Sequence, residues 1–383
     1  MPLLQKITRS TVRILGTVYS SRIVGLHNRV RAHASRLLVY KDLSLLPGPR
    51  PELTRGLFVP GRRRLVIYLK RGATEITVAH ELIHALLYGE AFLPLRCRSD
   101  DLVRNPGIGL LASRLNDLLV HPVVFERLRR CGYPISGRGT IDGGAEQVAP
   151  VHRFGRPWEG STGSRPLGAL AMAVAAAETI HRAPGSPATA LVGSLERRTR
   201  GLGELAKRIA RLAPWNRERS PLDGRLRAAR IVQELERGTR EIWGKEEDLP
   251  GRILMPAVLT KRRLAAPARA LFDARTARAG APGVVIGFLP DGAACSARAF
   301  ADASRAERVA EAVRGEMAGM SAERFIARHR LEYLFVEGGR RHAARRGGDS
   351  HDAEALFAQA GRHRRERMRR EAVRRPDAIL RRP

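Results

Sequence analysis

Cysteine is scarce in this chain of 383 residues, which contains three. Cys97, Cys131 and Cys295 lie far apart and form no CxxC pair. A disulfide-stabilised secreted fold and a structural zinc knuckle both need cysteines at close spacings, so the pattern argues against both classes. We therefore expect the protein to work in a reducing compartment, the cytoplasm.

Long apolar runs are lacking as well. The first residues interleave Lys6, Arg9 and Arg13 with apolar side chains, so we expect no secretory signal, which needs a continuous hydrophobic stretch. The most apolar segment, residues 167–177, is too short to cross a bilayer and is typical of a buried helix. We expect no membrane partner, and the sequence makes no prediction of the oligomeric state.

Aromatic residues make up only 5% of the chain, whereas Lys and Arg number 69 against 38 Asp and Glu, a formal charge of +31. Such a charge favours acidic partners, and one interpretation is an arginine-rich nucleic-acid-associated or scaffold protein. However, the few aromatics leave no platform for stacking bases. The abundance of Arg, Ala and Gly equally fits a GC-rich coding sequence, so nucleic acid is a weakly supported partner.

The clearest motif is the run His80-Glu81-Leu82-Ile83-His84, which lies in an otherwise uncharged stretch. On a helix, positions i and i+4 share a face, so both imidazoles could bind one metal ion while Glu81 reaches its open, water-bearing side. Water held in this way becomes nucleophilic at neutral pH. The motif therefore predicts a hydrolytic metal site.

The residues before the motif have the pattern of a strand, a turn and a helix start. Residues 64–69 read Arg-Leu-Val-Ile-Tyr-Leu and predict a β-strand, and residues 70–73 predict a turn. Thr74 is a suitable N-cap and Glu75 supplies an acidic first turn. A metal-binding helix is thus expected to begin at residue 75.

Residues 64–93 resemble the HExxH zinc metallopeptidases, the zincins, and weaker similarity extends to about residue 133. The resemblance implies an α+β fold, in which a mostly helical catalytic domain carries a small sheet. It also implies zinc as the cofactor, with His80 and His84 as ligands. Glu81 would be the general base that takes a proton from the zinc-bound water before attack on a peptide carbonyl.

A catalytic zinc of this kind needs a third protein ligand. Tyr88-Gly89-Glu90 follows the motif where a metzincin would continue towards a third histidine, so a second helix must supply the ligand. A helix over residues 108–130 would carry Asp117 and His121 one turn apart. In gluzincin-like enzymes an acidic ligand is followed four residues later by a side chain that orients a liganding histidine.

Either Asp117 is therefore the ligand and His121 the orienting residue, or His121 is the ligand with Asp117 or Asn116 behind it. Glu126 is a further candidate, although its neighbouring arginines favour ion pairing. Pro122 predicts a kink, or a junction between two short helices, at His121. The absence of a glutamate between Glu90 and Glu126 departs from the gluzincin pattern.

Peptide cleavage also needs a donor near the substrate carbonyl oxygen. Tyr88, Tyr133 and His152 are the nearest candidates by position. We favour Tyr88, because it follows His84 by about one helical turn.

The rest of the chain predicts a catalytic domain over residues 1–245, a small α/β module over 250–337 and a basic, disordered tail over 338–383. We expect one long helix or two consecutive helices over residues 8–40, a loop over the active-site cleft at 136–165, and a boundary at 249–251. The further elements expected are helices at 167–182, 188–212, 222–243, 305–317 and 322–329 and strands at 283–289 and 331–336.

The sequence therefore predicts a zinc-dependent metallopeptidase that hydrolyses peptide bonds through a zinc-bound water activated by Glu81. Its substrate would be a protein or peptide. The lack of a secretory signal and of a recognisable pro-segment favours an intracellular regulatory protease. The alternatives are the nucleic-acid-associated or scaffold protein with an inactive zincin fold, and a metal-dependent hydrolase of a non-peptide substrate.

Overall fold

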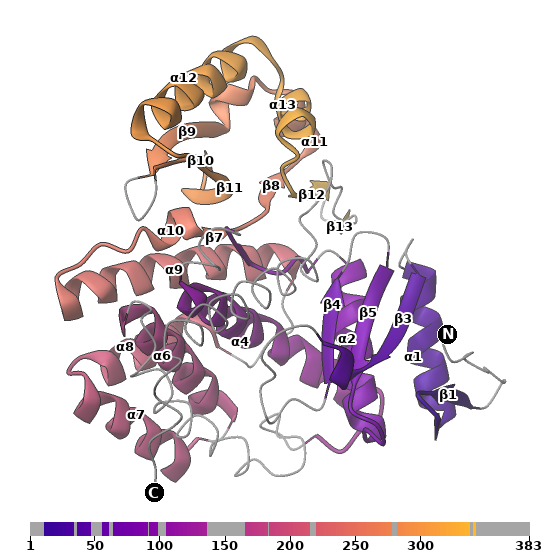
Figure 1. Cartoon of the computed structure of the whole chain (residues 1–383). Helices are drawn as coiled ribbons and strands as arrows, with labels where there is room; N and C mark the ends of the chain where they lie inside the picture. The colour runs from indigo at the N-terminus through magenta and orange to yellow at the C-terminus, as the bar shows by residue number, and fades with distance from the viewer. Residues whose placement is uncertain are drawn as a thin grey trace, which may run out of the picture.

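The computed structural model contains helices and several small sheets, which is consistent with the predicted α+β class (Figure 1). The described residues are 11–33, 37–46, 56–60, 64–90, 92–98, 105–135, 165–182, 184–214, 220–277, 282–337 and 340–341. The predicted loop at 136–165 lies outside them except for Arg165, and so does the predicted tail except for residues 340–341.

The N-terminal part is a three-stranded sheet of order β3-β5-β4, with β3 at Leu37–Asp42, β5 at Arg64–Leu69 and β4 at Gly56–Pro60. The β5 strand pairs with β3 in parallel and with β4 in antiparallel register. Because side chains alternate along a strand, β5 serves two cores. Leu65, Ile67 and Leu69 face one core, whereas Val66 and Tyr68 face the other.

The expectation of helix throughout residues 8–40 is wrong. A hairpin of β1 (Val12–Ile14) and β2 (Thr17–Tyr19) precedes α1 (Ser21–His33), and β3 follows. Leu15 and Gly16 form the turn with φ of 49° and 88°, which no right-handed helix contains. The apolar residues of this short segment fit a period of two as well as a helical one, so spacing alone could not decide.

Two helices carry the predicted metal site. The first, α2 (Glu75–Gly89), begins at the expected N-cap, where the side chain of Thr74 accepts a hydrogen bond from Thr77 N–H. The second, α4 (Pro106–Arg130), continues through Pro122, so the predicted junction between two short helices is wrong. Packing on both sides of the proline explains this, because Leu118 and Leu119 lie in one core and Val123 to Phe125 in another.

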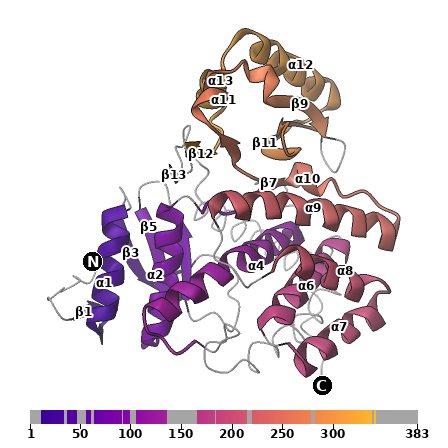
Figure 2. The same cartoon turned by 180° about the vertical axis from the view of Figure 1, so that it is seen from behind.

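A helical part packs against the first half of α4 (Figures 1 and 2). Its helices are α6 (Arg165–Arg182), α7 (Ser186–Arg198), α8 (Leu202–Leu212) and α9 (Pro221–Trp243). The single helix expected at 188–212 is in fact two, because the chain turns at Gly201 with φ of 88°. The helices expected at 167–182 and 222–243 are confirmed.

The C-terminal part lies on the far side of α9 from α6 and α7 in both views (Figures 1 and 2). One sheet has the order β11-β10-β9, and another the order β13-β12-β8. The strands are β8 (Ala257–Leu259), β9 (Phe272–Ala277), β10 (Gly283–Phe288), β11 (Ala293–Ala299), β12 (Tyr333–Glu337) and β13 (Arg340–Arg341). The helices are α11 (Lys261–Ala265), α12 (Ala303–Gly319) and α13 (Ala322–His329).

The predicted strand at 283–289 and both predicted helices of this part are confirmed. The flanking strands β9 and β11 escaped notice because their alanine and arginine residues have low strand propensity, so pairing with β10 decides their conformation. At the predicted boundary, α10 (Leu249–Arg252) leads into β7 (Ile253–Leu254), which pairs with β6 (Arg96–Cys97). This pairing links the chain after α2 to the start of the C-terminal part.

Within the described residues, one helical stretch, Gly107–Arg130 of α4, is long and apolar enough by length and composition to cross a membrane. Its most apolar window is 56% buried inside the protein, and the stretch contains Asp117 and His121. Core helices of soluble proteins meet the same criterion, so the stretch is weak evidence for a membrane span.

Candidate metal centre

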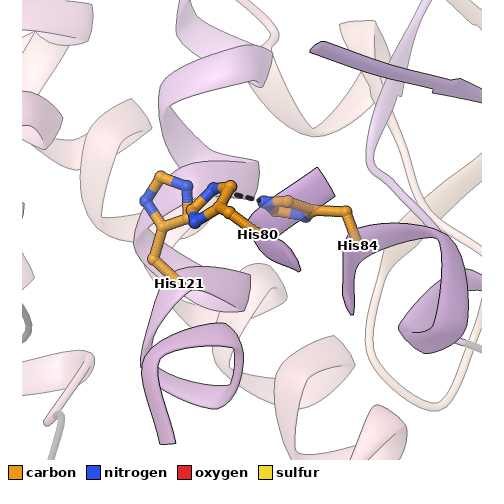
Figure 3. A group of neighbouring side chains, drawn as sticks. All are labelled: His80, His84 and His121. Carbon is orange, nitrogen blue, oxygen red and sulfur yellow. Dashed lines mark hydrogen bonds between the residues drawn. The ribbon is translucent and has the colours of Figure 1, made fainter. Parts of the chain in front are cut away.

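Three histidines converge between α2 and α4 (Figure 3). His80 and His84 come from successive turns of α2, and His121 comes from α4. One ring nitrogen of each lies within 4.8 Å of the other two, and the Nε2 atoms of His80 and His84 are 3.1 Å apart. Nitrogen ligands on a tetrahedral zinc ion lie about 3.3 Å apart. The group could therefore hold a metal ion.

The position of His121 follows from the packing of α4. The helix contributes Leu111, Leu115 and Leu118 to the core of the helical part, and then Val124 and Leu128 to the core beneath the sheet. His121 lies where the helix passes from one core to the other. An ion pair at the end of α2 also joins the two helices, with Arg127 donating to both carboxylate oxygens of Glu90 at 2.8 and 2.5 Å.

The two histidines of α2 are held in their neutral form. Burial lowers the pKa of His84 to about 3, and burial together with the neighbouring imidazoles lowers the pKa of His80 well below its ordinary value. A neutral imidazole has a free lone pair, which is the form that binds a metal ion. The Nδ1 atom of His80 is buried and has no hydrogen-bond partner among the described residues.

His121 has a different environment, because a carboxylate accepts from its other ring nitrogen. Its Nδ1 atom lies 2.9 Å from Oε1 of Glu178 on α6. Burial disfavours a charge on His121, but the hydrogen bond from the ring to Glu178 and the charge of Asp117 outweigh it and raise the pKa of His121. Burial opposes the charge on Glu178 too, yet His121 and Arg182 lower the pKa of its carboxyl to about 2.

Of the two predicted candidates for third ligand, His121 joins the group and Asp117 lies beside it. Oδ1 of Asp117 is 3.8 Å from Nε2 of His121, and its other oxygen is 3.5 Å from Arg114. Asn116 binds the backbone of Leu95 through both its amide oxygen and nitrogen. Asn116 therefore secures the segment after α2, while Asp117 lies beside Nε2 of His121.

Glu126, the remaining candidate, forms ion pairs with Arg129 and Arg130 on its own helix. Its side chain is 32% exposed, and it is not a member of the histidine group.

Glu81 is buried between α2 and the backbone of β4, which leaves 7% of the residue exposed. Burial raises the pKa of the Glu81 carboxyl to about 8, although the charge of His121 and a hydrogen bond from the Phe58 N–H lower it. A Cβ atom at Gly56 would lie 3.1 Å from Oε1 of Glu81. The first residues of β4 thus enclose the carboxyl.

The side chains predicted as possible donors to the substrate carbonyl oxygen have different environments. Tyr88 is buried, and its ring contacts Phe58 edge-on with centroids 5.8 Å apart. The Tyr133 hydroxyl donates to Glu75 in the first turn of α2, and burial together with this carboxylate raises the pKa of Tyr133. His152 lies outside the described residues. The role of Tyr88 stays a prediction.

Sequence analysis missed Glu178. The available signal was an acidic residue directly after the apolar, alanine-rich stretch 167–177, where a buried carboxylate needs a partner. Comparison of the chain with protein-family models, with curated proteins and with solved structures gives no match. The geometry of the site therefore carries the functional proposal by itself.

Proposed function

We propose that this protein is a zinc-dependent metallopeptidase. The observation that carries the proposal is the convergence of His80, His84 and His121, with Glu81 on the same helix as two of them. Three protein ligands with one position left for water are typical of catalytic zinc sites, whereas structural zinc sites use four. The described residues offer three ligands in one group.

The ligand types favour zinc but do not exclude other metals. Imidazole nitrogen binds zinc, copper, iron and nickel, whereas magnesium and calcium prefer oxygen. The group has no thiolate, and Asp117 lies to one side of it. Metal analysis of the purified protein decides between these ions.

Glu81 has the properties of a general base. A carboxyl whose pKa lies close to the working pH transfers protons efficiently in both directions, and burial raises the pKa of Glu81 to about 8. The bound metal ion would supply a lowered pKa of water and polarisation of the substrate carbonyl. Glu81 would accept the proton of the attacking water and pass it to the leaving amine. The enclosing backbone of β4 holds the carboxyl in position for both steps.

The strand next to Glu81 favours a peptide as the substrate. Among the described strands β4 pairs only with β5, so we propose that an extended chain adds along its other edge. Peptides bind such edges by adding a strand through main-chain hydrogen bonds. The backbone N–H of Phe58 lowers the pKa of Glu81, which supports a position of β4 beside the site. A peptide that lies along β4 would bring a main-chain carbonyl towards Glu81.

Glu81→Gln provides the sharpest test, because it removes the base and leaves all three histidines. We expect this variant to retain one equivalent of zinc and to lose hydrolysis of a fluorogenic peptide library, with kcat reduced about 100-fold or more. His84→Ala should lose the metal and the activity together. Full activity of Glu81→Gln contradicts the mechanism, and a wild-type protein that binds zinc but cleaves only esters contradicts the peptide substrate.

The charge of +31 favours a second candidate, a nucleic-acid-associated protein in which the metal site is inactive. Several described arginines already have acidic partners, such as Arg71 with Asp42 and Arg208 with Glu234. Filter binding to single- and double-stranded DNA across a salt series tests this candidate. Phosphate binding should weaken steeply as salt rises, whereas zinc-dependent hydrolysis should not.

A further inference from the structure

Glu178 is an acidic side chain in a helix whose preceding residues are apolar and buried. On α6 the neighbouring residues Ala173 to Ala177 are buried, and the side chain of Glu178 is only 8% exposed. An ionised carboxylate in such a place is costly unless charged or hydrogen-bonding partners surround it. The partners of Glu178 should therefore reveal its role.

Those partners lie on both helices. Oε1 of Glu178 accepts from Nδ1 of His121 on α4 at 2.9 Å and from Arg182, one turn further along α6, at 3.1 Å. The guanidinium of Arg182 lies 5.1 Å from the ring centre of Phe125. That ring also packs against His121 and His80, with centroid distances of 5.4 and 5.8 Å. Two residues of α6, Glu178 and Arg182, thus pack against His121 and Phe125 of α4 beside the histidine group.

The hydrogen bond to Glu178 determines which nitrogen of His121 is available. When Nδ1 carries the proton and donates it to the carboxylate, Nε2 keeps its lone pair. The ring is also fixed in orientation, because Phe125 packs on it and Glu178 holds one edge. A carboxylate partner in this position makes a liganding imidazole more basic and better aligned.

We propose that Glu178 is a positioning residue of the metal centre, which selects the Nε2 lone pair of His121 for the metal ion and makes α6 part of the site. The proposal rests on the metal-binding half of the proposed function and not on hydrolysis. It differs from the expectation that Asp117 or Asn116 on α4 would orient the ligand. The orienting carboxylate comes instead from a third helix, 57 residues further along the chain.

Two substitutions of Glu178 separate its hydrogen bond from its charge. Glu178→Gln keeps an oxygen that can accept from Nδ1–H but removes the charge, and Glu178→Leu removes both. Thr179→Val is the matched control, because Thr179 is also a buried polar residue of α6 but donates to the Ala175 carbonyl within its own helix. Loss of this hydrogen bond should loosen α6 without changing any contact to a histidine.

We expect zinc affinity, measured by competition with a chromophoric chelator, to fall about 10-fold in Glu178→Gln and towards 100-fold in Glu178→Leu. Thr179→Val should bind zinc as the wild type does. The visible spectrum of the cobalt-loaded protein should change in Glu178→Leu, since the orientation of one ligand changes. Thermal unfolding in a chelator reports the stability of each metal-free variant separately.

Wild-type zinc affinity in Glu178→Leu, or in Glu178→Gln if the leucine variant does not fold, overturns the proposal. An equal loss of affinity in Thr179→Val overturns it as well, because a general loosening of α6 would then explain the effect. A wild-type protein that takes up no metal refutes both this proposal and the proposed function. A protein whose zinc affinity depends on Glu178 but which cleaves no peptide refutes only the proposed function.

Discussion

Gly56 on β4 faces Glu81 so closely that a Cβ atom there would lie 2.9 Å from Cγ of Glu81. The same Cβ would lie 3.1 Å from Oε1 of Glu81 and 3.1 Å from a methyl carbon of Thr77. Carbon atoms in normal contact are about 3.5 Å apart or more. Only glycine therefore allows the edge strand to enclose the carboxyl in this way.

Gly56→Ala should displace the Glu81 side chain while the histidines keep their places. We expect zinc content to remain at the wild-type level and peptide hydrolysis to fall roughly 10- to 100-fold, because small misplacements of a catalytic group have effects of this size. Gly25→Ala on α1 is the control, since a Cβ at that position meets no atom within 4 Å. Unchanged hydrolysis in Gly56→Ala would show that Glu81 needs no support from β4.

The neighbouring pair Asp117 and His121 provides a test of the ligand set. We expect His121→Ala to lose stoichiometric zinc on dialysis, because one of three ligands is removed. Asp117→Ala should keep the zinc, since its carboxylate lies 3.8 Å from Nε2 of His121 and outside the histidine group. Elemental analysis of both variants measures the difference, and the reverse result would make Asp117 the ligand.

The metal-free protein should lose stability in acid partly through His84. Its pKa is about 3 when folded and about 6.5 when unfolded, so between these values only the unfolded chain takes up the proton. Stability from this group is therefore present above pH 6.5 and is lost as the pH falls towards 3. Below about 4.5 the ionised Glu178, with a pKa of about 2, adds a loss of the same sign.

Urea unfolding in a chelator at a series of pH values isolates this effect. His84→Gln cannot take up the proton, so the free energy of unfolding of the variant should depend less on pH. The difference in slope should be roughly 1 kcal/mol per pH unit between about pH 4 and 6. Parallel pH profiles for the wild type and the variant would mean that His84 is accessible to protons in the folded state.

Substitution by alanine at two glycines of α9 should change the stability of the protein in opposite directions. A Cβ at Gly238 would lie 2.7 Å from Cδ2 of Leu205 on α8, whereas a Cβ at Gly224 would meet no atom within 4 Å. Gly238→Ala should destabilise the protein by about 1–3 kcal/mol through overpacking. Gly224→Ala should stabilise it by up to about 1 kcal/mol through helix propensity. Thermal unfolding of both variants checks the contrast.

Local sequence was sufficient for the strand, turn and helix that lead to His84. The period of the apolar residues, the cap at Thr74 and the spacing of the two histidines are properties of neighbouring residues. The same logic was misleading before β3, where the hairpin at Leu15 and Gly16 interrupts apolar residues that suggested a helix. It was also misleading at Pro122, where the packing of α4 against two cores outweighs the loss of one hydrogen bond.

The sequence by itself determined that two histidines and a glutamate share one helix, because a helical period fixes the directions of side chains four residues apart. It could not decide between Asp117 and His121, since the rotation of α4 about its axis depends on the cores on either side. Only the tertiary structure placed His121 in the group and Glu178 behind it. Contacts between helices far apart in the chain arise from packing, which local periodicity does not specify.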